Sequence, residues 1–163
     1  MAILLPTAFE SKMRKLLAGE YPDFAASYGE PRHYGLRFNP LKIGPDDFLA
    51  RCPFHLTPVP WAKEGYYYAA GDRPGKHPYY HAGLYYIQEP SAMAPAEWLD
   101  VCPGDRVLDL CAAPGGKSTQ IAGKLRGQGL LVANDNQPER VKALVKNLAL
   151  FGVRNAVVTA ETP

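Results

Sequence analysis

The residues of this sequence best suited to chemistry lie between positions 107 and 118, which read VLDLCAAPGGKS. The acidic residue Asp109 closes an apolar run, and small residues then follow at alternate positions. The segment leads from an expected strand into an expected helix, which is where open parallel sheets bind their ligands. Small side chains let the backbone approach a ligand closely, and paired glycines allow a sharp turn into the helix. The pattern therefore predicts a ligand-binding loop.

Two familiar nucleotide-binding patterns fit this loop poorly. A dinucleotide site needs G-x-G-x-x-G, which the segment lacks. A P-loop needs G-x-x-x-x-G-K-[ST], and residues 111–118 match only its end, with Cys111 at the place of the first glycine. Pro114 also removes a backbone N–H from a loop that would have to offer such groups to phosphates. A P-loop-like nucleotide hydrolase is therefore kept as an alternative from another enzyme class.

A site for S-adenosyl-L-methionine accounts for the loop best. Nucleoside-dependent methyltransferases make room for this cofactor with an acid at a strand end and small residues at every second position. Here those positions hold Asp109, Cys111, Ala113 and Gly115. Asp135 ends the next expected strand, where its carboxylate can accept hydrogen bonds from ribose hydroxyls. Its alternative role is to cap the helix that starts at Gln137.

The elements that must position these residues begin at Pro90, where apolar runs start to alternate with helical patterns. After an expected helix in PSAMAPAEWLD, we expect strands at 106–110, 129–135 and 155–160, and helices at 115–125 and 137–152. The first of these strands is expected to be buried. The order β-α-β-α-β is typical of a parallel sheet covered by helices.

The preceding part of the chain is rich in proline and tyrosine. Thr7 and Glu10 have the spacing of a capping box, which predicts a helix that ends near Gly19. A strand is expected at 33–38 and a short helix from Pro45 to near Pro53.

Aromatic and basic residues alternate between positions 61 and 86. They could stack unpaired bases, or the tyrosines could simply pack a small core.

Composition excludes several classes of protein. The chain has 163 residues, a formal charge of +2 and 47% hydrophobic residues, the balance of a soluble globular protein. Its three cysteines show no C-x-x-C spacing, which argues against a disulfide framework, and its histidines lack the spacing of metal ligands, so no metal is expected. No apolar run is long enough for a signal peptide or a membrane span, so we expect a cytoplasmic protein with no membrane partner.

Four segments carry a resemblance to a known family. LCAAPGGKSTQIA (110–122) resembles the cofactor loop of the Nop/Sun family of RNA 5-methylcytosine methyltransferases, and LYYIQEPSAM (84–93) resembles the segment that leads into it. GLRFNPLK (35–42) is similar to the family's R-x-N-x-x-K stretch. LPTAFESKMRKLL (5–17) is similar to the bacterial small-subunit ribosomal RNA branch, its F-type in particular.

The resemblance implies an α/β fold, the first half of a Rossmann-like S-adenosylmethionine-dependent methyltransferase sheet preceded by a small α+β domain. The expected domains are 1–83, which contacts RNA, and 84–163, which binds the cofactor. The implied cofactor-binding residues are Cys111, Ala112, Ala113, Pro114, Gly115, Gly116, Lys117, Asp135 and Arg140. Arg140 would lie along the adenosine, or is a solvated helix residue. Arg37, Asn39 and Lys42 would belong to the RNA-facing part, or form a strand edge and turn.

The resemblance also implies a chemistry for which this chain has no catalytic residue. In the family a cysteine thiolate adds to the cytosine ring, and its P-C-[ST]-G and T-C segments follow the cofactor loop. We therefore expect the nucleophile beyond Pro163, a longer parent enzyme that makes 5-methylcytosine in small-subunit ribosomal RNA, and no activity for this chain alone. Cys111 is expected to act as a small apolar residue, and Cys52 and Cys102 precede prolines without a base nearby. A non-catalytic RNA-binding module is the remaining alternative.

Overall fold

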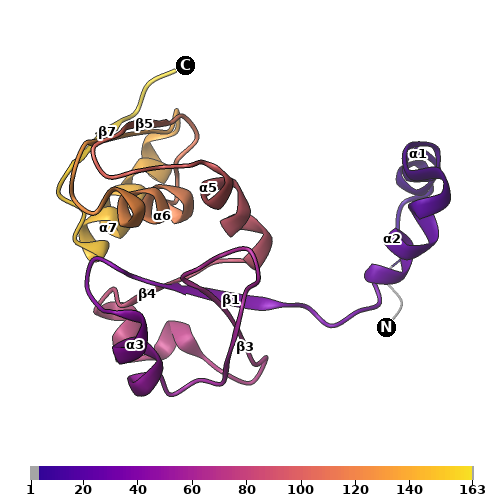
Figure 1. The fold of residues 1–163 in the computed structure, drawn as a ribbon. Helices are drawn as coiled ribbons and strands as arrows, with labels where there is room; N and C mark the ends of the chain where they lie inside the picture. Colours follow the sequence, from indigo (N-terminus) through magenta and orange to yellow (C-terminus); the bar gives the residue numbers. More distant parts are fainter. Residues whose placement is uncertain (1–3, 163) are drawn as a thin grey trace. The chain divides into compact units, whose positions relative to one another are not determined.

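The computed structural model describes residues 4–162, and the chain divides into two compact units with the boundary between Arg32 and His33. The first unit contains α1 (Thr7–Leu17), a 3-10 turn (Ala18–Glu20) and α2 (Tyr21–Ser27) (Figure 1). Aromatic rings join its helices: Phe24 contacts Phe9, and the Arg14 guanidinium lies 4.0 Å from the centre of the Tyr21 ring. Among the described residues, no helix has both the length and the apolar character needed to cross a membrane.

The start of α1 differs from the expected capping box. Pro6 is the N-cap residue and Thr7 is already helical, so no side chain caps the helix. Glu10 accepts a hydrogen bond from the Tyr21 hydroxyl at 3.2 Å instead. The capping-box prediction is wrong because Pro6, with φ of −61° and ψ of 134°, already supplies the extended residue ahead of the helix.

The second unit opens with an antiparallel sheet in the order β2-β3-β1-β4. Its strands are β1 (Tyr34–Phe38), β2 (Leu56–Pro58), β3 (Gly65–Tyr68) and β4 (Tyr85–Ile87). Around them lie α3 (Pro45–Arg51), a 3-10 turn (Pro74–Lys76) and α4 (Pro78–His81). Phe38, Phe48 and Tyr85 are buried together in the core of this sheet. Tyr66 joins the same core, so these tyrosines pack rather than stack bases.

A parallel sheet follows, with strand order β5-β6-β7. A 3-10 turn (Pro90–Met93) and α5 (Ala94–Trp98) lead into it. Its elements are β5 (Arg106–Asp109), α6 (Gly116–Leu125), β6 (Leu130–Asn134), α7 (Pro138–Phe151) and β7 (Ala156–Thr159). Figure 1 shows α6 and α7 together on one side of the strands. The predicted β-α-β-α-β order is confirmed, and each element lies within two residues of its expected bounds.

The two faces of this sheet are covered differently. Leu131 and Ala133 are fully buried against the helices. On the other face, Leu108, Val132 and Val157 form one cross-strand row, in which Leu108 is 58% and Val157 49% exposed. Because side chains alternate along a strand, β5 is covered on one face only by the described residues. The expectation that strand 106–110 is buried is therefore wrong.

The predicted domain boundary, between residues 83 and 84, falls just ahead of β4. That strand pairs with β1 and so completes the antiparallel sheet. Both sheets belong to the compact unit that begins at His33. The assignment of RNA contacts to 1–83 and cofactor contacts to 84–163 stays a prediction.

Candidate functional site

The predicted loop runs from the carboxyl end of β5 to the start of α6. Asp109 closes the strand, and its Oδ2 accepts a hydrogen bond of 2.7 Å from the hydroxyl of buried Ser118 in α6. Gly115 occupies the N-cap position with φ of 114°, a conformation that L side chains rarely adopt. A β-carbon there would also lie 3.3 Å from Leu144 of α7. Glycine at this position thus lets the loop turn while it lies against α7.

One face of α7 holds the loop by its carbonyl groups. Arg140 Nη2 donates to the carbonyl oxygen of Ala113 at 2.7 Å. Asn147 Nδ2 donates to the carbonyl oxygen of Pro114 at 2.8 Å. Leu144 lies between these two residues in the i, i+4, i+7 pattern of one helix face. The face of α7 therefore fixes two successive peptide groups of the loop.

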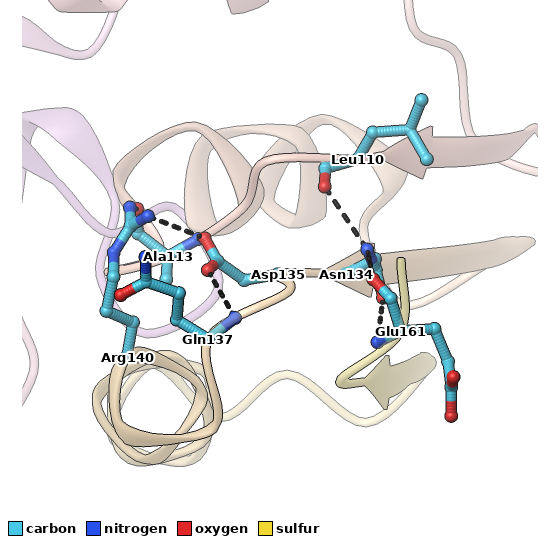
Figure 2. A network of polar contacts seen from close by, with 7 residues as sticks. All are labelled: Leu110, Ala113, Asn134, Asp135, Gln137, Arg140 and Glu161. Carbon is cyan, nitrogen blue, oxygen red and sulfur yellow. Dashed lines mark hydrogen bonds and ion pairs between the residues drawn. The ribbon is translucent and has the colours of Figure 1, made fainter. Parts of the chain in front are cut away.

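Asp135 follows β6 and is 2% exposed. Its Oδ2 accepts a hydrogen bond from the Ala113 N–H at 3.2 Å and lies 3.3 Å from Arg140 Nη1 (Figure 2). Its Oδ1 accepts a hydrogen bond from the Gln137 N–H at 3.2 Å, the capping role considered for it. The carboxylate thus joins the loop to the start of α7. Its role toward a ribose stays a prediction.

Asn134, next to Asp135, organises the same edge of the sheet (Figure 2). Its Nδ2 donates to the carbonyl oxygens of Leu110 at 3.3 Å and Glu161 at 2.9 Å. Its Oδ1 accepts hydrogen bonds from the Thr159 hydroxyl at 2.7 Å and the Glu161 N–H at 2.9 Å. The 3% exposed amide, at the end of β6, therefore bonds to the chain at the carboxyl ends of both neighbouring strands, β5 and β7. Sequence reasoning missed Asn134 and Asn147, and the only signal was their polar character beside predicted site residues.

The first turn of α6 offers backbone donors. Within residues 4–162, the N–H groups of Gly115, Gly116, Lys117 and Ser118 have no hydrogen-bond partner. Such groups at the start of a helix carry a partial positive charge and bind carboxylates and other anions. Lys117 also lines a pocket of about 220 Å³ together with Asp109 and Leu108. The site can thus combine amide donors, a nearby carboxylate and an apolar wall.

The cysteines of the described chain are all unpaired thiols. Cys102 and Cys111 are exposed, and Cys52 is partly buried. Burial raises the pKa of the Cys52 thiol, which lowers the fraction of reactive thiolate. This agrees with the interpretation that Cys52 is not a nucleophile.

Two of the R-x-N-x-x-K side chains are buried. Arg37 is 1% exposed and Asn39 is fully buried, so neither side chain is open to direct contact with RNA, while their place in an RNA-facing part of the chain stays a prediction. Asn39 Nδ2 donates to the carbonyl oxygens of Gly83 at 2.8 Å and Phe151 at 3.0 Å. Both side chains extend from the antiparallel sheet into its contact with the parallel half, where a buried donor satisfies buried carbonyls.

Lys42 completes this arrangement. Its ammonium group donates to the carbonyl oxygens of Ala82 at 2.8 Å and Leu150 at 2.7 Å. Leu150 is in the last turn of α7, where the free carbonyls attract a cation. We refer to Arg37, Asn39 and Lys42 together as the clamp. Its members tie the antiparallel sheet to α6 and α7.

Replacing Asn147 with alanine is expected to lower the free energy of unfolding by about 1 kcal/mol, the usual worth of one such hydrogen bond. The Gly115 N–H belongs to the same planar peptide as the Pro114 carbonyl, so its NMR signal should shift as well. Asn155→Ala is the matched control, because Asn155 Nδ2 donates to the Gln128 carbonyl oxygen at 3.0 Å away from the loop. A Gly115 signal unchanged in N147A would contradict the role given to Asn147.

The parallel sheet, the small-residue loop after β5 and the buried acid after β6 define the chain as a Rossmann-like domain of the methyltransferase class. Comparison with known families specifies it further. The family described as the N-terminal domain of 16S rRNA methyltransferase RsmF matches residues 5–90. The family of 16S rRNA methyltransferase RsmB/F matches residues 96–162. The chain therefore belongs to the RsmB/F family of 16S rRNA methyltransferases, which confirms the resemblance seen in the sequence.

Curated relatives agree with this assignment. Ribosomal RNA small subunit methyltransferase F of Erwinia tasmaniensis is 41% identical over 169 residues, a match that covers 96% of this chain and 35% of the relative. The protein of the same name from Citrobacter koseri is 37% identical, with 97% and 35% covered. The chain thus spans about a third of the length of these relatives.

Solved structures share the fold. A methyltransferase homolog protein from Pyrococcus horikoshii superposes with a TM-score of 0.87 at 32% identity, covering 97% of this chain and 53% of that one. NSun6 from the same organism gives a TM-score of 0.83 at 18% identity, covering 96% and 65%. The expected fold class is therefore confirmed.

Proposed function

We propose that this chain binds S-adenosyl-L-methionine and forms part of an enzyme that makes 5-methylcytosine in small-subunit ribosomal RNA. Family membership supports the enzyme class. The observation that carries the cofactor assignment is the buried carboxylate of Asp135 beside a loop whose N–H groups lack partners. Both lie at the carboxyl edge of a parallel sheet, the usual site for a nucleoside ligand.

The residues present fit the chemical groups of this cofactor. The N–H groups at the start of α6 suit its carboxylate. Asp135 suits its ribose hydroxyls, because a carboxylate accepts two hydrogen bonds at once. When bound, the cofactor supplies an electrophilic methyl group. The segment Cys111–Lys117 and Asp135 would bind and orient it, while Arg140 would act by holding Asp135 and the Ala113 carbonyl oxygen.

Residues 1–83 are proposed as the part that contacts RNA. Most of this segment matches the N-terminal family, and α1 carries the exposed basic residues Lys12, Arg14 and Lys15. Basic side chains on one element supply the phosphate contacts that nucleic-acid binding needs. Ribosomal RNA as substrate would place the enzyme in the cytoplasm.

Isothermal titration of the 163-residue chain with S-adenosylhomocysteine tests the cofactor assignment. We expect saturable one-to-one binding, and no heat of binding with ATP and Mg²⁺ at the same concentrations. Binding of ATP with Mg²⁺ alone would overturn the proposal in favour of a nucleotide hydrolase. A chain that binds ribosomal RNA but has no affinity for S-adenosylhomocysteine would overturn it in favour of a non-catalytic RNA-binding module.

A further inference from the structure

The buried guanidinium of Arg37 contacts the cofactor loop from the neighbouring sheet. Arg37 lies in β1, paired with Gly65 of β3 on one side and Tyr86 of β4 on the other. Its Nη2 donates to the carbonyl oxygen of Gly116 at 3.2 Å and to the hydroxyl of Thr119 at 2.8 Å. The first turn of α6 is therefore bonded to a strand of the other sheet.

This arginine is buried without a carboxylate partner. No acidic side chain of residues 4–162 lies within ion-pair distance of it, and the centre of the Phe151 ring lies 5.7 Å from its guanidinium carbon. Burial lowers the pKa of Arg37 to about 10, so the side chain stays protonated at neutral pH. An unpaired buried charge costs several kcal/mol, which only its hydrogen bonds can offset. The N–H groups of the guanidinium therefore have a role that an apolar side chain of similar size could not fill.

Those donors are arranged around one peptide group. Thr119 Oγ1 accepts from Arg37 and donates to the Gly116 carbonyl oxygen at 3.1 Å, which closes a ring of three hydrogen bonds. Arg37 Nε donates to Gln88 Oε1 at 3.2 Å, and Gln88 Nε2 donates to the Ala92 carbonyl oxygen at 2.9 Å. The guanidinium is thus oriented from one side and directs the Gly116 carbonyl on the other.

The orientation of that carbonyl decides the direction of the next N–H. In a planar trans peptide the C=O of Gly116 and the N–H of Lys117 point in opposite directions. Gly115 and Gly116 have no side chains to restrict rotation at the loop end, and Gly116 is the first residue of α6, so an outside contact adds support to the helical orientation of this peptide plane. Arg37 provides that contact, and the Lys117 N–H, which lacks a partner among the described residues, points away from Arg37.

We propose that Arg37 is a positioning residue that fixes the peptide between Gly116 and Lys117, so that the Lys117 N–H is presented to the cofactor. The inference rests on the proposed function, in which this loop binds S-adenosyl-L-methionine. It gives the R-x-N-x-x-K segment a role in cofactor binding in place of direct RNA contact for Arg37. The antiparallel sheet thereby becomes part of the support of the cofactor site.

The test compares two clamp residues that bond to different helices. Arg37→Met removes the bond to Gly116, while Lys42→Met removes the bonds to Ala82 and Leu150, away from the loop. In titrations of the whole chain with S-adenosylhomocysteine, R37M should raise the dissociation constant at least tenfold and K42M less than twofold. R37K, which keeps the positive charge and a donor group but loses the planar fork of the guanidinium, should fall between the parent chain and R37M. Equal affinities for R37M and the parent chain would overturn the inference.

A second measurement separates this inference from the proposed function. The ¹⁵N–¹H signals of Lys117 and Ser118, recorded without any ligand, should shift in R37M and R37K but not in K42M. If the parent chain binds no S-adenosylhomocysteine, the proposed function fails, and these signals still decide whether Arg37 fixes the peptide. Unchanged Lys117 signals in folded R37K would overturn the positioning role of Arg37. If R37M does not fold, R37K takes its place in both measurements.

Discussion

Gly83→Ala is expected to lower the free energy of unfolding by about 4 kcal/mol, the sum of left-handed backbone strain and a steric overlap. Gly83 has φ of 68°, and an added β-carbon would overlap the carbonyl oxygen of Leu150. Relief requires the end of α7 to move away from the segment between α4 and β4. That movement would also break the bonds that Asn39 and Lys42 donate to the end of α7, at the carbonyl oxygens of Phe151 and Leu150. Urea denaturation followed by circular dichroism measures the loss.

Gly104→Ala is the matched control for this prediction. Gly104 also has a positive φ, 101°, but no heavy atom lies within 4 Å of the position where its β-carbon would be. G104A should therefore cost only the backbone strain, about 1–2 kcal/mol. Equal losses in G83A and G104A would show that the approach of Gly83 to α7 contributes nothing to stability.

Asp135→Asn is expected to weaken binding of S-adenosylhomocysteine about 100-fold. Each hydrogen bond from a ribose hydroxyl to a buried carboxylate contributes about 1.5–3 kcal/mol, and 1.4 kcal/mol corresponds to a tenfold change in affinity. The substitution keeps the shape of the side chain but removes its charge and one acceptor oxygen. It also removes the ion pair with Arg140, at 3.3 Å, that holds the loop. Isothermal titration gives both dissociation constants.

Asp105→Asn controls for the loss of a carboxylate at this sheet. Asp105 precedes β5 at the opposite edge, where its Oδ2 accepts a hydrogen bond from the Cys102 N–H at 2.8 Å. D105N should leave the affinity for S-adenosylhomocysteine unchanged within twofold. If D135N binds S-adenosylhomocysteine with an affinity within threefold of the parent chain, Asp135 does not contact the cofactor. Its role would then be limited to its bonds to Ala113 and Gln137.

The parallel half was predictable because its signals are local. Pro138 in the first turn and Gly152 after the last residue mark the bounds of α7 almost without ambiguity, and the helix spans Pro138–Phe151. The course of the loop from β5 into α6 was equally predictable, since paired glycines allow a sharp turn into a helix, while its contact with a ligand stays a prediction. The position of Asp135 at the end of β6 followed from the length of the apolar run before it.

The features that the sequence did not reveal depend on contacts between distant residues. Arg37 and Gly116 are 79 positions apart, and Asn147 and Pro114 are 33 apart, so no local pattern connects them. The same holds for the open face of β5, because Leu108 and Leu131 look alike until the packing of α6 and α7 distinguishes the two faces. The location of the nucleophilic cysteine beyond Pro163 stays a prediction.

The four hydrogen bonds of Asn134 help to determine the register in which the three parallel strands pair. Its amide bonds to Leu110, Thr159 and Glu161, so its full set of partners exists only when all three strands are aligned as found. A slip of β7 by one residue would present the wrong face to the helices and leave this buried amide unsatisfied, at about 1–3 kcal/mol for each lost partner. Asn134 thus favours the observed strand register, because a mispaired sheet is less stable even when no ligand is bound.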